Sequence, residues 1–206
     1  FLTQGFETIF ELGEYFFTVL LVLIIHLIFT YGGLLLILGK INIFKFFSKM
    51  KNSMLFAFST SSSAATIPIN LKTVEENLGV KKSVASFTVP LGATINMDGT
   101  AIMQGVATVF IANTYGIDLS IADFMSVILV ATLASIGTAG VPGVGLIMLT
   151  MVLNQVGLPV EGIALIIGID RILDMTRTAV NVTGDATISC IVAKIEKKLD
   201  IKKLNS

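Results

Sequence analysis

The chain has 206 residues, of which 54% are hydrophobic and 14% are charged, and its formal net charge is zero. Ordinary soluble domains carry about 25% charged residues, so this composition, with a mean hydropathy of +0.88, is typical of a membrane protein. No basic patch interleaved with aromatic residues occurs, which argues against a nucleic-acid partner, and the single Cys190 excludes an intrachain disulfide or a cysteine metal cluster.

Residues 15–38 are the plainest expected transmembrane helix, within a first segment of residues 1–51. These 24 residues are uncharged and would extend about 36 Å as a helix, enough for a full span. His26 lies near the middle, where a proton relay is one interpretation and a histidine hydrogen-bonded inside the bundle is the more common one. Lysines follow at positions 40, 45, 49 and 51 and favour a cytoplasmic end there. The sequence opens on Phe1 without a signal-peptide pattern, so we expect it to begin inside a longer protein.

The next stretch, residues 54–71, is uncharged but is interrupted by five hydroxyl side chains at positions 59–63. Its apolar start is too short to cross about 30 Å of hydrocarbon. The hydroxyls and Pro68 suit a turn with backbone groups free for a ligand. We therefore expect a re-entrant hairpin over residues 52–82, with a serine-rich surface loop as the alternative.

Residues 83–117 carry one charge, Asp98, near their middle. Pro90 and two glycines lie around Asn96 and Asp98 and should interrupt the helix there, which exposes carbonyl oxygens of the kind that bind sodium. A buried aspartate paired with a lysine or arginine is the alternative.

Residues 124–160 are uncharged for 37 residues, yet their centre, residues 137–145, reads GTAGVPGVG. A straight helix through this centre is implausible, and each flanking arm would be about 20 Å long, short of a bilayer. We expect a second re-entrant hairpin whose glycine-rich tip acts as a gate.

The last expected helix, residues 162–194, carries a polar stripe, and residues 195–206 form a charged tail. At 100° per residue the stripe lies within an arc of about 80°, with Thr178 at its edge. Ionisable groups on one face of a membrane helix are costly unless they face a cavity, an ion or one another, so the sequence predicts a transport site. The stripe consists of Asp170, Asp174, Arg177, Asn181 and Asp185.

The order of these segments is full span, hairpin, broken helix, hairpin and charged helix. Two interrupted segments in corresponding halves indicate a secondary transporter with inverted repeats and a binding site near the membrane midplane. The expected fold class is therefore an all-α membrane protein with transmembrane helices, two re-entrant hairpins and an inverted-repeat transport core.

Four motifs in this order resemble the glutamate transporter family of sodium/dicarboxylate symporters. They are SSSAAT at residues 61–66 followed by Pro68, NMDGT at 96–100, the glycine-rich tip at 135–145 and the charged run at 170–185. The resemblance covers nearly the whole chain. It implies a fold of eight transmembrane helices and two hairpins, assembled as a homotrimer, of which this sequence holds the sixth helix onward.

The resemblance also implies a substrate site. Asp174 would hold the amino group of an amino acid and Arg177 its side-chain carboxylate, in keeping with the bidentate match between a guanidinium and a carboxylate. A simple i,i+3 pair between the two residues is the alternative. The other substrate residues implied are Ser62, Ser63, Thr100, Val141, Gly145, Thr178 and Asn181.

Two or three sodium sites follow from the same resemblance. One would use the carboxylate of Asp185 with carbonyl groups of Gly92, Asn96 and Asn181. A second would use carbonyl groups of Thr94, Ser135, Ile136 and Thr138. A third would use Asp98 and Asn96 and needs further ligands from an earlier helix.

Three positions are compared with the family pattern. Ser61 stands where the archaeal carriers have arginine and the animal carriers have serine. Arg171 is about 100° from Asp170, so we interpret it as an outer partner. Gln104 stands where the proton- and potassium-coupled animal carriers have glutamate, and a neutral amide takes up no proton, so we predict uptake without potassium countertransport.

The sequence thus predicts a sodium-coupled symporter of aspartate or glutamate in the cell membrane, working by alternating access, and not an enzyme. A proton-coupled or C4-dicarboxylate symporter of the same family is the first alternative, and an ion channel is an alternative of another class. A soluble enzyme disagrees with the spans and with the lack of a nucleophile and base pair.

Overall fold

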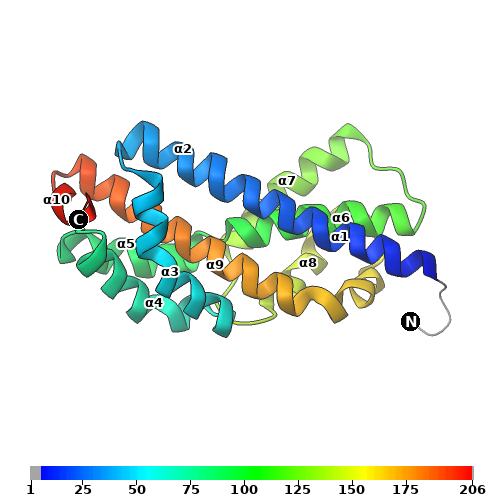
Figure 1. The fold of residues 1–206 in the computed structure, drawn as a ribbon. Helices are drawn as coiled ribbons and strands as arrows, with labels where there is room; N and C mark the ends of the chain where they lie inside the picture. The colour runs from blue at the N-terminus through cyan, green and yellow to red at the C-terminus, as the bar shows by residue number, and fades with distance from the viewer. Residues whose placement is uncertain (1–5, 206) are drawn as a thin grey trace.

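The computed structural model describes residues 6–205, which are helical apart from short connections and one isolated bridge between Val80 and Leu199. The molecule is elongated, and two long helical rods run along it (Figure 1). Of the expected segments 1–51 and 195–206, residues 1–5 and 206 lie outside the described residues.

The first rod is one continuous helix with two π-helical turns. It consists of α1 (Phe6–Ile25), a π turn at His26–Tyr31, α2 (Gly32–Leu34) and a second π turn at Leu35–Gly39. Its stretch Phe10–Gly39 is 30 residues long and is, within the described chain, the one helix long and apolar enough to cross a membrane. Only 22% of its most apolar window is buried, so most of the rod is open to its surroundings.

Eight further α-helices follow this rod along the described residues. They are α3 (Ile43–Thr60), α4 (Ser63–Lys72), α5 (Lys82–Ile95), α6 (Asp98–Thr114), α7 (Ile121–Ile136), α8 (Val144–Gln155), α9 (Ile163–Ile195) and α10 (Ile201–Asn205). A π turn, Thr73–Asn77, continues α4, and a 3₁₀ turn, Val160–Gly162, precedes α9. The long helix α9 contacts α1, α3, α4, α5, α6 and α8, so the other elements pack around it.

The turn between α3 and α4 is only two residues long. Ser61 ends α3 in the left-handed region, with φ 52°, and Ser62 caps α4 by accepting a hydrogen bond from the Ala65 amide. The prediction that Pro68 belongs to this turn is wrong, because Pro68 lies inside α4. A proline there removes one intrahelical hydrogen bond, and packing in the bundle retains the helix around it.

The expected break near NMDGT is two residues wide. Asn96 and Met97 have φ,ψ angles of −97°,80° and −114°,44°, outside the helical range, and α6 begins at Asp98. Pro90 does not interrupt the helix, since α5 continues through it to Ile95. The interruption therefore arises at the residues that carry the polar groups.

The glycine-rich stretch separates two short apolar helices that contact each other, α7 and α8. A capping box starts α7, in which Ser120 and Asp123 each bond the backbone amide of the other. The helices are 16 and 12 residues long, about 24 and 18 Å at helical rise. Both are shorter than the hydrocarbon core of a bilayer.

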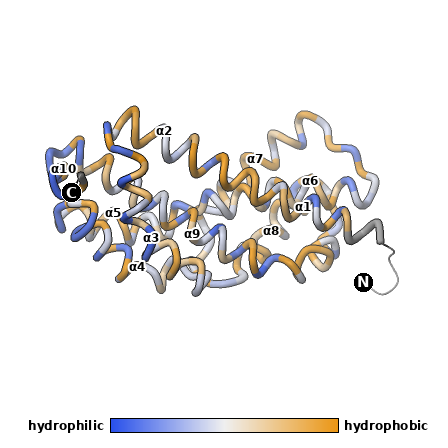
Figure 2. The backbone as a smooth tube through the Cα atoms, in the orientation of Figure 1, coloured by the Kyte–Doolittle hydropathy of each residue, from blue (hydrophilic) through white to orange (hydrophobic). Residues whose placement is uncertain are grey.

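Two hydrophobic cores lie along α9. One joins the first rod to α6, α7, α8 and the first half of α9, and the other joins α3, α4 and α5 to its second half. Many large apolar side chains remain exposed, among them Phe29 at 73% and Ile37 at 75%. Apolar residues colour most of the tube in Figure 2, while the end near α10 is hydrophilic. Such a surface suits an apolar surrounding and not water.

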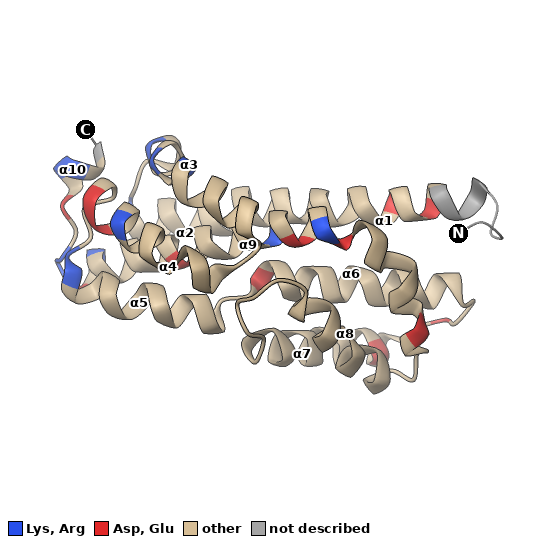
Figure 3. Ribbon diagram, turned by 90° about the horizontal axis from the view of Figure 1, so that it is seen from below, with Lys and Arg blue, Asp and Glu red and all other residues tan. Residues whose placement is uncertain are grey.

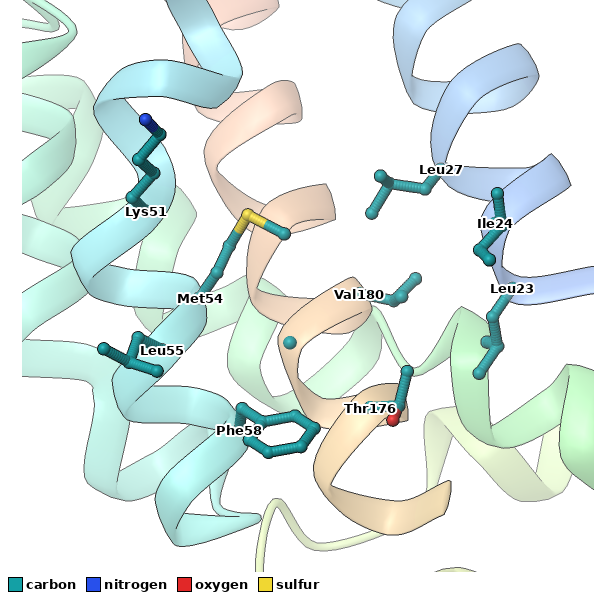
Figure 4. Close-up of a pocket in the computed structure, with 10 residues that line it drawn as sticks. Leu23, Ile24, Leu27, Lys51, Met54, Leu55, Phe58, Thr176 and Val180 are labelled. Atoms are coloured by element: carbon teal, nitrogen blue, oxygen red, sulfur yellow. The ribbon is translucent and has the colours of Figure 1, made fainter. Parts of the chain in front are cut away.

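An apolar groove of about 550 Å³ lies between α1, α3 and α9 (Figure 4). Leu23, Met54 and Phe58 are among the side chains that line it, and Thr176 and Lys51 are its polar members. The Thr176 hydroxyl already donates to a carbonyl of its own helix. Because the groove offers so few polar partners, the candidate site for a charged ligand lies elsewhere.

Candidate functional site

The polar stripe of α9 is organised around Arg177. Its guanidinium donates to both carboxylate oxygens of Asp170, at 2.8 and 3.3 Å, and to Asp174 at 3.0 Å. Asp170 lies two helical turns before Arg177, on the same face of α9. The sequence predicted this shared face but not the pair between the two residues. The arginine side chain is only 1% exposed, and Figure 3 shows this row of charges in the middle of α9. Two carboxylates face one buried guanidinium, so this group of three side chains carries one net negative charge.

Asp174 also holds the loop between α7 and α8. Its second oxygen accepts a hydrogen bond from the Gly143 amide at 3.0 Å. Gly143 has φ 80°, in the left-handed region, where glycine avoids the steric penalty of a side chain. A single carboxylate thus connects Arg177 to the predicted gate.

The two predicted hairpin tips are the turn between α3 and α4 and the glycine-rich loop between α7 and α8, and they meet at Gly140. Its carbonyl accepts hydrogen bonds from the Ser62 hydroxyl at 2.8 Å and the Ala64 amide at 3.1 Å. A Cβ at Gly140 would lie 3.0 Å from the Ala93 carbonyl and 3.2 Å from the Ala64 amide, so a side chain would disturb this contact. The two tips are thus held together through the Gly140 carbonyl.

A small polar cavity lies beneath the joined tips. Its volume is about 10 Å³, room for about one water molecule. The wall comes from both tips, from the break between α5 and α6, and from α9. Seven predicted substrate residues line it: Ser63, Thr100, Val141, Gly145, Asp174, Thr178 and Asn181.

The other two predicted substrate residues lie just outside this cavity. Ser62 uses its hydroxyl to cap α4 and to bond Gly140, whereas Ser61 reaches the cavity wall. Arg177 is buried and is linked to the cavity wall through its ion pair with Asp174. The roles of all nine residues stay predictions.

The residues predicted for the first sodium site are brought together around Asp185. The Asn96 amide donates to the Asp185 carboxylate and to the Asn181 carbonyl, both at 3.0 Å. A Cβ at Gly92 would overlap the Asp185 carboxylate, so the glycine provides the space that this group occupies. Asp185 is 2% exposed, and no ion pair links it to a lysine, arginine or histidine within residues 6–205. A buried carboxylate beside carbonyl groups, without a cationic side chain, fits a bound cation.

The residues predicted for the second sodium site lie at the ends of α5 and α7, two helices in contact. Ser135 and Thr138 are buried, and the Ser135 carbonyl accepts from the Thr138 amide. Thr94 and Ile136 are exposed. This set stays a prediction.

Asp98, predicted for the third site, has partners that the sequence did not indicate. Its Oδ2 accepts from the Tyr31 hydroxyl at 2.9 Å and lies 3.1 Å from His26 Nε2. The alternative of a lysine or arginine partner is wrong, because the partners of Asp98 among the described residues are a tyrosine and a histidine of the first rod. His26 is therefore hydrogen-bonded inside the bundle, as the more common of its two interpretations expected.

The sequence itself decides the family. The profile of the Sodium:dicarboxylate symporter family matches residues 1–195. The chain belongs to this family. This is a family of membrane transporters and not of enzymes.

Several relatives of this chain are named as excitatory amino acid transporters. Excitatory amino acid transporter 3 of Mus musculus is 46% identical over 195 residues, which cover 95% of this chain and 37% of that protein. Excitatory amino acid transporter 2 of Homo sapiens is 43% identical over 192 residues, 91% of this chain and 33% of that protein. A Caenorhabditis elegans protein named as a sodium-dependent excitatory amino acid transporter is 44% identical over 185 residues, 90% of this chain and 37% of that protein. The chain thus spans 33–37% of the length of these relatives.

Sequence reasoning gave no specific contact to four residues of this site. Asp170 and Tyr31 each bond a predicted site residue, while Gly140 and Ser61 lie at the meeting of the tips. The pair between Asp170 and Arg177 could have been predicted, since the sequence already placed both residues on one helical face. Tyr31 is remote in sequence from Asp98, and nothing in the local pattern indicated the contact.

Proposed function

We propose that the full protein is a sodium-coupled symporter of acidic amino acids, aspartate or glutamate, and that it works by alternating access in the cell membrane. The observation that carries this proposal is the buried Arg177, held by Asp170 and Asp174 beside a polar cavity under two closed tips. Family membership and the similarity to excitatory amino acid transporters support it.

Substrate binding would proceed as an exchange of partners. Asp170 grips Arg177 through two hydrogen bonds and keeps the guanidinium oriented. The Nη2 donor shared with Asp174 then turns to the side-chain carboxylate of the substrate, while the freed Asp174 accepts the substrate ammonium. After the exchange Arg177, Asp174, the substrate ammonium and the side-chain carboxylate each have an ionic partner. The α-carboxylate would accept hydrogen bonds from the polar cavity wall, to which Thr178 and Asn181 belong.

Gate movement is coupled to this exchange through Asp174. Its bond to the Gly143 amide competes with the incoming ammonium, so ligand binding and the loop contact respond to each other. A cavity of about 10 Å³ admits no amino acid until the tips separate. Of the two tips, the glycine-rich loop between α7 and α8 has the greater backbone freedom. We therefore assign the gate to this loop.

Sodium binding would balance the acids that lack a cationic side chain. Asp185 is buried next to the Asn96 amide and the Asn181 carbonyl, and the Asn181 side chain accepts from the Gly99 amide at 2.8 Å. Asn181 also lines the substrate cavity, so it connects the two sites. Two or three sodium ions per subunit follow from the predicted ligand sets. Substrate affinity should rise steeply with sodium, and sodium affinity with substrate.

The architecture proposed is that of a transport core with inverted repeats. In it, α3 with α4 (residues 52–82) and α7 with α8 (residues 124–160) are re-entrant hairpins whose tips meet near the midplane. The broken helix of residues 83–117 and the last helix of residues 162–194 lie between them. Contacts of a homotrimer would come from segments beyond this chain.

Labelled aspartate uptake by the full-length protein in vesicles tests this function. We expect uptake to follow an imposed sodium gradient and not a proton or potassium gradient. Uptake driven by protons alone would favour the proton-coupled alternative. Succinate that competes with aspartate at equal concentration would favour a C4-dicarboxylate carrier, and a steady current without substrate coupling would favour a channel.

A further inference from the structure

A π-helical turn in the first rod brings two polar side chains to the same acid. The turn covers His26–Tyr31, and the Gly32 amide donates to the Leu27 carbonyl five residues earlier. In an α-helix, residues five apart point about 140° away from each other. Hydrogen bonding from i to i+5 widens the helix and brings such residues closer to one face than an α-helix does, and π turns of this kind occur often at functional sites. His26 and Tyr31 can therefore face the same side of the rod.

Both residues use this alignment to hold one oxygen of Asp98. The Tyr31 hydroxyl lies 2.9 Å and His26 Nε2 lies 3.1 Å from Oδ2, and the two rings pack edge to face with centroids 4.7 Å apart. Tyr31 is only 2% exposed, whereas Phe29 in the same turn is 73% exposed. A buried hydroxyl needs a partner, and Asp98 supplies it. The other carboxylate oxygen, Oδ1, accepts no hydrogen bond from the described residues.

The Tyr31 hydroxyl also adjoins the cluster around Asp185. A Cβ placed on Gly184 would overlap both the Tyr31 hydroxyl and the Asn96 amide, so these two groups converge over α9 at the residue before Asp185. Asn96 in turn bonds Asp185. Asp98, Tyr31, Asn96 and Asp185 thus form one polar cluster between the first rod, the break and α9.

We propose that Tyr31 is a positioning residue for sodium binding, which fixes Oδ2 of Asp98 so that Oδ1 stays available to a sodium ion beside Asn96. This inference rests on the proposed sodium-coupled function. A carboxylate held by a charge-assisted hydrogen bond keeps one orientation, and a cation site gains affinity when its ligands need no rearrangement. The π turn is the element that supplies this hydroxyl.

The test is a hydroxyl deletion with a matched control in the same rod. Tyr31→Phe removes the bond to Asp98, while Tyr15→Phe removes a buried hydroxyl that has no hydrogen-bond partner. Sodium binding to the full-length protein is measured by calorimetry and by the rise in Tm with added sodium. We expect Tyr31→Phe to raise the half-saturating sodium concentration about tenfold and Tyr15→Phe to leave it within about twofold.

A double-mutant cycle with Asp98→Asn separates positioning from general packing. If Tyr31 acts through Asp98, Tyr31→Phe should add no further loss of sodium affinity in the Asp98→Asn background. An unchanged sodium affinity in Tyr31→Phe, or a full additional loss in the double variant, would overturn the assignment. If the unmutated protein binds no sodium, the proposed function fails as well, so the two failures are distinguishable.

Discussion

The two halves of the α9 stripe treat buried acids in different ways. In the first half, Asp170 and Asp174 share the guanidinium of Arg177. In the second half, Asp185 has an amide donor from Asn96 and no cationic side chain among the described residues. The difference indicates which ligand each half is suited to bind. A half that contains its own cation suits a zwitterion that exchanges partners, whereas a half that lacks one suits a metal cation.

Removing the guanidinium from the first half of the α9 stripe should have the largest effect on substrate affinity. Arg177→Thr removes the shared cation and leaves two buried carboxylates, and the loss of a buried ion-pair partner costs about 3–5 kcal/mol. We expect aspartate affinity to fall at least about a hundredfold and small neutral amino acids to become the better substrates. Competition uptake measures the change. Arg171→Thr, which removes an exposed arginine without an ion pair, is the control, and acidic selectivity retained in Arg177→Thr would contradict the role.

Breaking the second half should change sodium dependence first. Asp185→Asn keeps the shape but removes the charge that faces the proposed ion, so we expect the half-saturating sodium concentration to rise about tenfold or more. Aspartate affinity at saturating sodium should change much less. Asp118→Asn, at an exposed acid, is the matched control. Sodium titrations of binding by calorimetry decide it, and a parallel loss of both affinities would contradict the division of α9 into halves.

A side chain added where the two tips meet should lower aspartate affinity and leave sodium affinity unchanged. Gly140→Ala places a Cβ 3.0 Å from the Ala93 carbonyl, which should weaken tip closure and lower aspartate affinity roughly fivefold to tenfold. Gly105→Ala is the control, because no atom outside its own helix backbone lies within 4 Å of the added Cβ. Equal effects of the two variants in binding assays would show that the tip contact does not matter.

The hydroxyl that joins the tips should have a smaller effect. Ser62→Ala deletes the cap of α4 and one of two bonds to the Gly140 carbonyl. A cap is worth about 1 kcal/mol, so we expect a roughly fivefold loss of aspartate affinity and a slightly lower Tm. Ser59→Ala, whose hydroxyl bonds only its own helix, should be neutral in the same assays.

Internal potassium should have no effect on uptake. Gln104 is fully buried, and its amide donates to the Gly145 carbonyl at 3.3 Å, next to the gate. A neutral side chain there offers no proton exchange for potassium to replace. Sodium-driven uptake should be equal in vesicles loaded with potassium or with choline, and dependence on internal potassium would contradict the prediction.

Much of this arrangement is encoded in local sequence patterns. A break in the helix between Pro90 and Gly99 and a polar face on the last helix could be predicted, because backbone chemistry and a period of 3.6 residues determine them. The break lies at Asn96 and Met97, where it was expected, but Pro90 takes no part in it, because packing lets α5 continue through the proline. Tertiary context likewise keeps Pro68 within α4.

From periodicity and composition alone, without the family resemblance, the site was predictable where residues share one helix and not where they meet across helices. Asp170 and Arg177 lie on one face of α9, whereas Tyr31 and Asp98 come from different elements. The π turn added a second obstacle, since an α-helical period assigns His26 and Tyr31 to different faces. The direction of the Ser62 hydroxyl depends on the left-handed backbone of Ser61, which the sequence alone does not reveal.

The unbroken length of α9 has a mechanical consequence. From Asp170 to Asp185 the helix rises about 22 Å without a proline or a kinked turn, so it behaves as a stiff strut. A displacement of the Arg177 end along the helix axis would move the Asp185 end by the same distance. Under the proposed function, a substrate bound near Arg177 and a sodium ion bound near Asp185 would therefore move together by the same distance.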